Sequence, residues 1–261
     1  MGFRDWLRSV KRRVHPKYVK ARRIRYAHGP DGISLIQSRS SGAAYFFPYA
    51  AKSDFYVIQL FNLAHGFDEH LKQKYSCETI HVRPGDTVID CGGFVGGFSV
   101  AASKMGADRV LYVEPTPKTK RCAELNFHLH GCQNVSAFEM ALGQELGTAK
   151  LNLSSSGSNN SLLAPDEDDL NAQIDVQVST LEKLSHDQSI DPDRAFVKVE
   201  AEGFEVEIIR GLGGFRPRSI VVDVTPERGG KSPYKIIKDD LKALGYTNFV
   251  RTKRCLFAER V

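Results

Sequence analysis

The sequence of 261 residues has no long apolar run and few cysteines. No stretch reaches the roughly 18 apolar residues that a transmembrane helix requires, and the N-terminus lacks the apolar core of a secretory signal. The five cysteines are odd in number and include no CxxC pair, which argues against a disulfide framework and against a zinc site. These absences predict a cytoplasmic protein.

Basic residues are concentrated at the N-terminus. The formal net charge is +5, but residues 1–25 contain ten Lys and Arg and one acidic residue, whereas the remainder contains 26 basic and 30 acidic residues. Trp6, Leu7, Val10 and Val14 fall on one face of a short helix in this basic arm. Three interpretations stay open: a solvated arm, a peripheral anchor to the anionic inner face of a membrane, and a nucleic-acid site. Nucleic acid is not expected as a partner, because the rest of the chain has no basic stripe.

From His81 onward, apolar runs of strand length alternate with helical segments. This alternation is typical of an α/β fold with buried parallel strands and right-handed crossovers. We predict a mostly parallel central sheet with an antiparallel C-terminal edge hairpin. The expected strands are Thr87–Cys91, Arg109–Glu114, Asn134–Phe138, Ala195–Glu200 and Ser219–Val224, the expected helices are Gly97–Lys104, Lys118–His130, Phe204–Leu212 and Tyr234–Leu244, and the hairpin joins Asn248–Thr252 to Arg254–Glu259.

The sequence predicts three parts: a basic N-terminal arm (1–25), an N-terminal α/β extension that caps the substrate (26–80), and a larger α/β domain (81–261). A polar stretch interrupts the larger domain at residues 143–180. We expect a solvated loop there, with a lid over a substrate as the alternative. In the extension, strands are expected at Ile33–Ile36 and Ala44–Phe47, and helical segments at Phe55–Leu63 and Asp68–Tyr75.

A glycine-rich turn follows the first strand of the larger domain and opens a helix. It reads DCGGFVGG at residues 90–97, and Glu114 ends the next strand 22 residues after Gly92. Glycines let the backbone approach a ligand closely, and a carboxylate at the end of the second strand accepts hydrogen bonds from ribose hydroxyls. The pattern therefore predicts an adenosine-containing cofactor.

The turn does not match the dinucleotide fingerprint GxGxxG. Phe94 stands where a frame from Gly92 needs glycine, and Val95 stands where a frame from Gly93 needs one. Asp90, directly before the turn, also suits a cationic ligand better than a pyrophosphate. These features favour S-adenosylmethionine, whose ammonium and sulfonium groups are cationic. A NAD(P)-dependent oxidoreductase and a non-catalytic adenosine-cofactor-binding partner in a glycan-assembly complex remain the alternatives.

Lys198, Glu200 and Glu202 alternate at the end of the fourth strand, so an extended chain would place all three on one side. Polar groups in such a position are costly unless they serve a site or pair with each other. We hypothesise that Glu200 or Glu202 accepts the proton of an acceptor hydroxyl and that Lys198 holds the carboxylates or the acceptor in place. The alternative is a structural Lys198–Glu200 ion pair, with Glu205 capping the next helix. No metal site is predicted, although Asp223 would add a third carboxylate to Glu200 and Glu202.

Together these segments resemble the FkbM family of S-adenosylmethionine-dependent methyltransferases. The matching segments are PGDTVIDCGGFVGGFS, YVEPTP, NVSAFEMALG, VSTLEKL and VKVEAEGFEVEIIRGL, which occur in family order between residues 80 and 225. The resemblance implies a class I methyltransferase (Rossmann-like) fold, with residues 81–261 as the S-adenosylmethionine-binding domain. It also implies methyl transfer to oxygen, on a hydroxyl of a sugar, glycan or related natural product.

The resemblance also assigns residues. Lys198, Glu202, Gly203 and Glu205 match the family signature K-x-D-x-E-G-x-E, from which Glu200 departs because aspartate is more usual there. Catalytic roles are predicted for Lys198, Glu200 and Glu202. The predicted cofactor contacts are Asp90, Gly92, Gly93, Phe94, Gly96, Glu114, Pro115, Glu139 and Met140.

Overall fold

The computed structural model describes residues 24–39, 42–48, 66–154, 160–163 and 170–260. The chain divides into two compact units, Met1–His70 and Leu71–Val261. The helices predicted in the basic arm and at Phe55–Leu63 lie outside the described residues. No helix in the described ranges is both long and apolar enough to cross a membrane.

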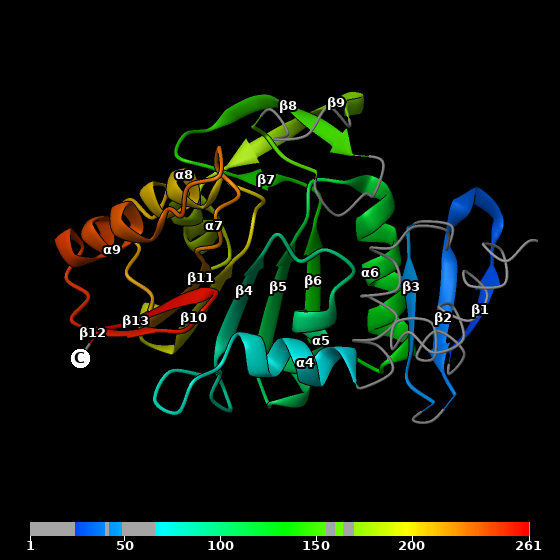
Figure 1. The fold of residues 1–261 in the computed structure, drawn as a ribbon. Helices are drawn as coiled ribbons and strands as arrows, with labels where there is room; N and C mark the ends of the chain where they lie inside the picture. The colour runs from blue at the N-terminus through cyan, green and yellow to red at the C-terminus, as the bar shows by residue number, and fades with distance from the viewer. Residues whose placement is uncertain (1–23, 40–41, 49–65, 155–159, 164–169, 261) are drawn as a thin grey trace, which may run out of the picture. The chain divides into compact units, whose positions relative to one another are not determined.

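The first unit contains a small antiparallel sheet of β1 (Ile24–His28), β2 (Ser34–Ser38) and β3 (Ala44–Phe47), in that order (Figure 1). The structure confirms the two strands predicted here and adds β1, which the sequence analysis did not predict. Ile36, Tyr45 and Phe47 are fully buried, as expected for alternate residues of strands with one inner face. Tyr45 packs edge-on against Phe67, with ring centroids 5.1 Å apart. Phe67 begins α4 (Phe67–Lys74), the helix in which the first unit ends.

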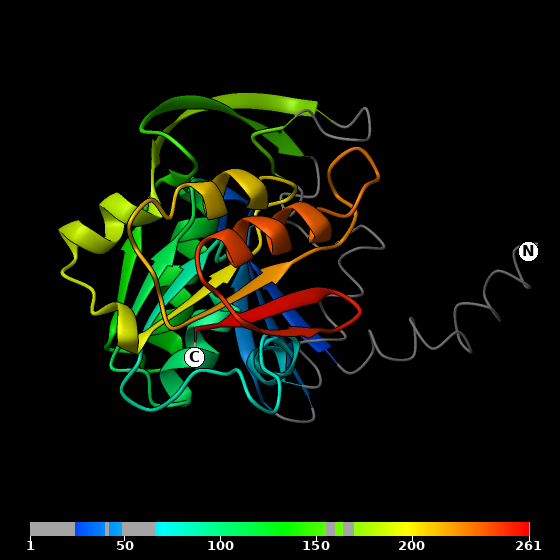
Figure 2. The same cartoon turned by 90° about the vertical axis from the view of Figure 1, so that its left-hand side faces the viewer.

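The second unit is built on a seven-stranded sheet in the order β12-β13-β11-β10-β4-β5-β6 (Figure 1). The strands are β4 (Thr87–Cys91), β5 (Arg109–Val113), β6 (Val135–Phe138), β10 (Ala195–Val199), β11 (Ser219–Asp223), β12 (Asn248–Arg251) and β13 (Cys255–Glu259). The five strands from β6 to β11 in this order are parallel, whereas β13 runs antiparallel to both β11 and β12. Figure 2 shows this edge hairpin in red. The predicted class I methyltransferase fold is confirmed.

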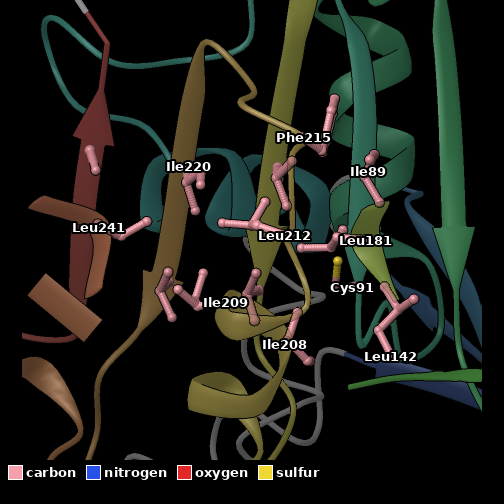
Figure 3. Packing of buried hydrophobic residues seen from close by; sticks show 14 of the residues in the cluster. Ile89, Cys91, Leu142, Leu181, Ile208, Ile209, Leu212, Phe215, Ile220 and Leu241 are labelled. Carbon is pink, nitrogen blue, oxygen red and sulfur yellow. The ribbon is translucent and has the colours of Figure 1, made fainter. Parts of the chain in front are cut away.

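Helices cover both faces of this sheet. They are α5 (Gly97–Lys104), α6 (Pro117–Leu129), α7 (Leu181–Asp187), α8 (Glu205–Arg210) and α9 (Tyr234–Ala243). Successive residues of a central strand face opposite sides: Ile89 packs in a cluster with residues of α7, α8 and α9 (Figure 3), whereas Val88 packs with Phe98 of α5. Because both faces are buried, the central strands are mostly apolar, and this is the pattern that the sequence displays.

Residues 143–180 contain two strands of a second sheet rather than the expected solvated loop. β7 (Ala141–Leu142), β8 (Gly147–Ser154) and β9 (Leu170–Ser179) pair in the order β7-β9-β8. Leu151 and Val176 are buried with Ala141 in a small core. The loop prediction is wrong for β8 and β9, because their alternate apolar residues bury one face while polar residues occupy the other. The polar run at 155–159 and the acidic run at 166–169 lie outside the described residues.

The second unit begins before residue 81, the predicted start of the larger domain. Tyr75, Ile80 and Val82 are buried in the cluster that also contains Val88. Residues 71–80 therefore pack with the large sheet, and this packing brings the end of α4 to it.

Candidate active site

The polar residues predicted to form a site gather at one edge of the seven-stranded sheet. The central strands are parallel, so their carboxyl ends share this edge. Asp90 on β4 lies opposite Lys198 on β10 and opposite Tyr112 on β5. The direction of chain progression across the sheet reverses between β4 and β10, and ligands of open α/β sheets bind in the crevice at such a reversal.

The glycine turn after β4 is packed tightly against the chain itself. The N–H groups of Gly92 and Gly93 both donate to the carbonyl oxygen of Val113, at 3.0 and 3.1 Å. Gly92 has a φ of +68°, and a Cβ there would lie 1.8 Å from the carbonyl oxygen of Glu200. At Gly96, with a φ of +82°, a Cβ would lie 2.5 Å from the Phe127 ring. These glycines are required by close backbone and ring contacts as well as by any ligand.

Glu114 links the end of β5 to this turn. One carboxylate oxygen accepts the N–H of Phe94 at 3.2 Å, and the other accepts the N–H of Thr116 at 3.0 Å. The side chain is buried, and burial raises the pKa of Glu114 to about 7 against the lowering effect of these hydrogen bonds. Phe94 has a φ of +48°, and its carbonyl oxygen accepts the hydroxyl of Tyr112. The carboxylate predicted to bind ribose therefore lies beside the turn at the crevice.

Asp90 and Lys198 form a buried ion pair beneath the turn. Lys198 Nζ lies 3.0 Å from Asp90 Oδ1 and donates to the carbonyl oxygens of Cys91 and Gly92, at 3.2 and 2.8 Å. The other oxygen of Asp90 accepts the hydroxyl of Ser99 at 2.7 Å. Burial alone would lower the pKa of Lys198, but Asp90 and Glu200 raise it. Both side chains are almost completely buried, so the pair holds the shape of the turn from inside the protein.

Glu200 is held by two residues that sequence reasoning missed. Its carboxylate lies 2.5 Å from Lys74 Nζ, accepts the hydroxyl of Tyr75, and lies 3.7 Å from Lys198 Nζ. Burial alone would raise the pKa of Glu200, but Lys74 and Lys198 lower it to about 2. Lys74 Nζ also lies 2.8 Å from Asp223 Oδ2, at the end of β11. An ammonium thus stands between two of the three carboxylates considered for a metal site, and the described ranges contain no group of His, Cys, Asp and Glu arranged to hold a metal ion.

Glu202 does not continue the alternation of Lys198 and Glu200. Its φ is +48°, and Gly203 follows with a φ of +96°, so the extended strand gives way to a turn after Glu200. The expectation that all three side chains share one side assumed an extended chain, and the backbone at Glu202 does not meet that condition. Within the described part of the chain, the carboxylate of Glu202 has no hydrogen bond or ion pair, and burial with nearby Glu227 and Glu200 raises its pKa well above the usual range. Glu205 accepts the N–H groups of Ala201 and Gly203 at 2.8 and 3.2 Å, so these bonds hold the turn before α8 and do not cap the helix.

The remaining predicted contacts follow β5 and β6 at the same edge. The N–H of Glu114 donates to the carbonyl oxygen of Phe138 at 3.1 Å, which places Pro115 near Glu139 and Met140. Glu139 is half exposed, with one oxygen 3.9 Å from Lys120 Nζ. Met140 packs against the large apolar cluster. Contact of these three residues with a cofactor stays a prediction.

Comparison with known proteins gives one family and several distant folds. A family model described as methyltransferase FkbM domain matches residues 90–247, and no curated protein matches the sequence. The solved FkbM methyltransferase of Methylobacillus flagellatus KT is 13% identical with a TM-score of 0.47, and the match covers 79% of this chain and 55% of that one. This chain therefore spans about half the length of that protein. The magnesium protoporphyrin IX methyltransferase of Synechocystis PCC 6803, solved with bound SAM, is 14% identical with a TM-score of 0.45, and the match covers 81% of this chain and 86% of that one.

The family expected from the sequence motifs is confirmed by the family model. The matched region contains the glycine turn, Glu114 and the Lys198–Glu205 signature, and it extends over more than half of the 261 residues. The chain belongs to the methyltransferase FkbM domain family.

Proposed function

We propose that this chain transfers a methyl group from S-adenosylmethionine to a hydroxyl of a sugar, glycan or related natural product. Its family supports methyl transfer. The observation that carries the proposal is the carboxylate of Glu114 at the crevice, hydrogen-bonded to the glycine turn at Phe94. A carboxylate at the end of the second strand, beside a glycine turn after the first, is suited to the ribose of an adenosyl group.

The residues at the crevice suit such a donor. The carboxylate of Glu114 accepts the N–H groups of Phe94 and Thr116 and the hydroxyl of Thr116, and it keeps one further acceptor position for a ribose hydroxyl. We assign Pro115, Glu139 and Met140 to the remaining contacts with the adenosyl group. Asp90 acts on the cofactor through the turn, because its own carboxylate is fully buried. The bound donor supplies a methyl group that its sulfonium sulfur already makes reactive.

Glu202 is the group that we assign as proton acceptor. An acceptor hydroxyl becomes a better nucleophile when a nearby base removes its proton, an effect of about 10²–10⁴-fold. Glu200 is a poor base, because Lys74 and Tyr75 already bind its carboxylate and its pKa is lowered to about 2. Glu202 lies in the turn that follows the same strand, has no partner among the described side chains, and has a raised pKa. These properties favour Glu202 of the two candidates.

The experiment that tests the function begins with ligand binding. Calorimetry should detect S-adenosylmethionine and S-adenosylhomocysteine and should detect no binding of NAD. A screen of sugar, glycan and polyketide acceptors with isotope-labelled donor then seeks a methylated hydroxyl. Failure of both adenosyl ligands to bind would refute the proposal, and binding of NAD alone would point instead to an oxidoreductase. Binding without transfer to any acceptor would favour a non-catalytic partner.

A further inference from the structure

We propose that Lys74 and Tyr75 are positioning residues for the cofactor turn, which they hold in place through Glu200 and Lys198. The inference rests on the proposed function, because its readout is the binding of the adenosyl cofactor. Both residues precede the region matched by the family model. They reach the sheet edge because the end of α4 is buried against the large sheet.

Lys198 is the residue that holds the turn directly. Its ammonium has three protons, and three oxygen acceptors at the turn lie within 3.2 Å: the carbonyls of Cys91 and Gly92 and the carboxylate of Asp90. Glu200 lies 3.7 Å away, as a second carboxylate that attracts the same ammonium. A Lys198 drawn toward Glu200 would leave the carbonyl of Gly92 without its donor.

Lys74 and Tyr75 remove this competition. Lys74 Nζ lies 2.5 Å from Glu200, and the hydroxyl of Tyr75 donates to the other oxygen of the same carboxylate. Lys74 is itself fixed from a second side by Asp223, at 2.8 Å. Only 11% of the Lys74 side chain is exposed, so these attractions are weakly screened by water. Glu200 therefore has its own cation, and Lys198 remains with the turn.

The backbone of Glu200 couples it to the turn a second time. Its N–H donates to the carbonyl oxygen of Cys91 at 3.1 Å, and its carbonyl oxygen lies against the α-carbon of Gly92 with no room for a Cβ. A shift of Glu200 therefore moves Gly92. Gly92 leads into the turn at Phe94, and the N–H of Phe94 donates to Glu114.

The test measures S-adenosylhomocysteine affinity by calorimetry on the full chain. We expect Lys74→Gln to weaken binding about tenfold, within the range of coupling between contacting charged groups. The double variant Lys74→Gln with Glu200→Gln should bind about as well as Glu200→Gln alone, because the carboxylate that attracts Lys198 is gone. Lys74→Arg should retain affinity. Lys183→Gln, which removes an exposed ion pair with Asp187 on α7, is the matched control and should bind as the wild type does.

Tyr75→Phe tests the positioning role with little risk to folding. It removes the hydroxyl that Glu200 accepts but preserves the ring, which packs edge-on against Phe98 with centroids 5.2 Å apart. It should weaken binding in the same direction, and it decides the matter if Lys74→Gln does not fold. Undiminished affinity in both single variants, or a double variant that binds clearly more weakly than Glu200→Gln alone, overturns the inference and leaves the proposed function intact. A wild type that does not bind S-adenosylhomocysteine overturns both.

Discussion

Replacing Glu114 with glutamine should weaken S-adenosylhomocysteine binding and abolish its dependence on pH. In the structure the carboxylate accepts the N–H groups of Phe94 and Thr116 and the hydroxyl of Thr116, and it keeps one further acceptor position. A hydrogen bond to a charged group contributes roughly 1.5–3 kcal/mol. Glutamine keeps one neutral acceptor and turns the other oxygen into a donor, so the loss is about 3 kcal/mol and Kd rises about 100-fold.

The pH dependence follows from the raised pKa of Glu114. Its carboxyl titrates at about 7 in the folded protein because burial disfavours the charged form. Ribose hydroxyls donate to the ionised form, so affinity is full above this pH and falls up to about tenfold per unit below it. The variant has no ionisable group at this position and should show a flat profile.

Calorimetry over a pH series on both sides of about 7 measures both effects. Glu124→Gln is the control, since it removes a half-exposed carboxylate of α6 that pairs only with Lys120 among the described residues. The control should keep the affinity and pH profile of the wild type. A wild type with pH-independent affinity, or a Glu114→Gln variant that binds as tightly as the control, would refute the reasoning about ribose.

Three further results are expected. Glu202→Gln should lower kcat about 100-fold or more and remove the rise of kcat with pH, whereas Glu200→Gln should keep that rise; equal kinetics for the two would contradict the assignment of the base. Gly92→Ala should lower the free energy of unfolding in urea by about 3 kcal/mol, because its Cβ would meet a backbone carbonyl, whereas Gly131→Ala, with a similar φ and open space, should cost about 1 kcal/mol. Without ligand, folded Glu114 binds its proton more tightly than the unfolded chain does, so stability falls as pH rises from about 4.5 to about 7; Glu114→Gln should remove about 3 kcal/mol of that fall in urea titrations.

The central sheet is predictable because each of its buried strands is a short, mostly apolar run in the sequence. A strand buried on both faces is mostly apolar, and β4 and β11 show this in the short runs Val88–Ile89 and Ile220–Val222. The proximity of the glycine turn to Glu114 is also predictable. Each follows one of two adjacent parallel strands, and the carboxyl ends of such strands lie at the same edge of the sheet. The family signature at Lys198–Glu205 likewise lies in one continuous segment.

The sheet of β7, β8 and β9 was not predicted, because the polar composition of this region hides the alternation of apolar residues in its strands. Ser, Asn and Asp dominate the segment between Leu151 and Leu170, and this polarity favours a loop. Yet Ile174, Val176 and Val178 alternate strictly with polar residues, which is the signal of a strand with one buried face. Register then pairs Leu151 with Ile174 across the hairpin.

Lys74 and Tyr75 leave no comparable signal in the sequence. Their contacts with Glu200 join residues 126 and 125 positions apart, and neither Lys74 at the end of α4 nor Tyr75 directly after it interrupts or extends a pattern in the sequence. The backbone at Glu202 could not be predicted for a different reason: an alternating spacing predicts one side only while the chain stays extended, and the left-handed turn at Glu202 and Gly203 ends that extension. The periodicity of apolar and polar residues encodes neither the tertiary contacts of Lys74 and Tyr75 nor the local backbone angles at Glu202.

The contact between the carbonyl of Glu200 and Gly92 constrains how this protein can be re-engineered. The segment after β10 and the glycine turn, which the proposed function assigns to the acceptor and the donor, touch through main-chain atoms, so loop exchange at one of them alters the other. Libraries aimed at new acceptors should therefore leave the backbone from Lys198 to Glu200 unchanged. Diversity is better introduced on the outward, polar face of β8 and β9, whose inner face keeps its own core.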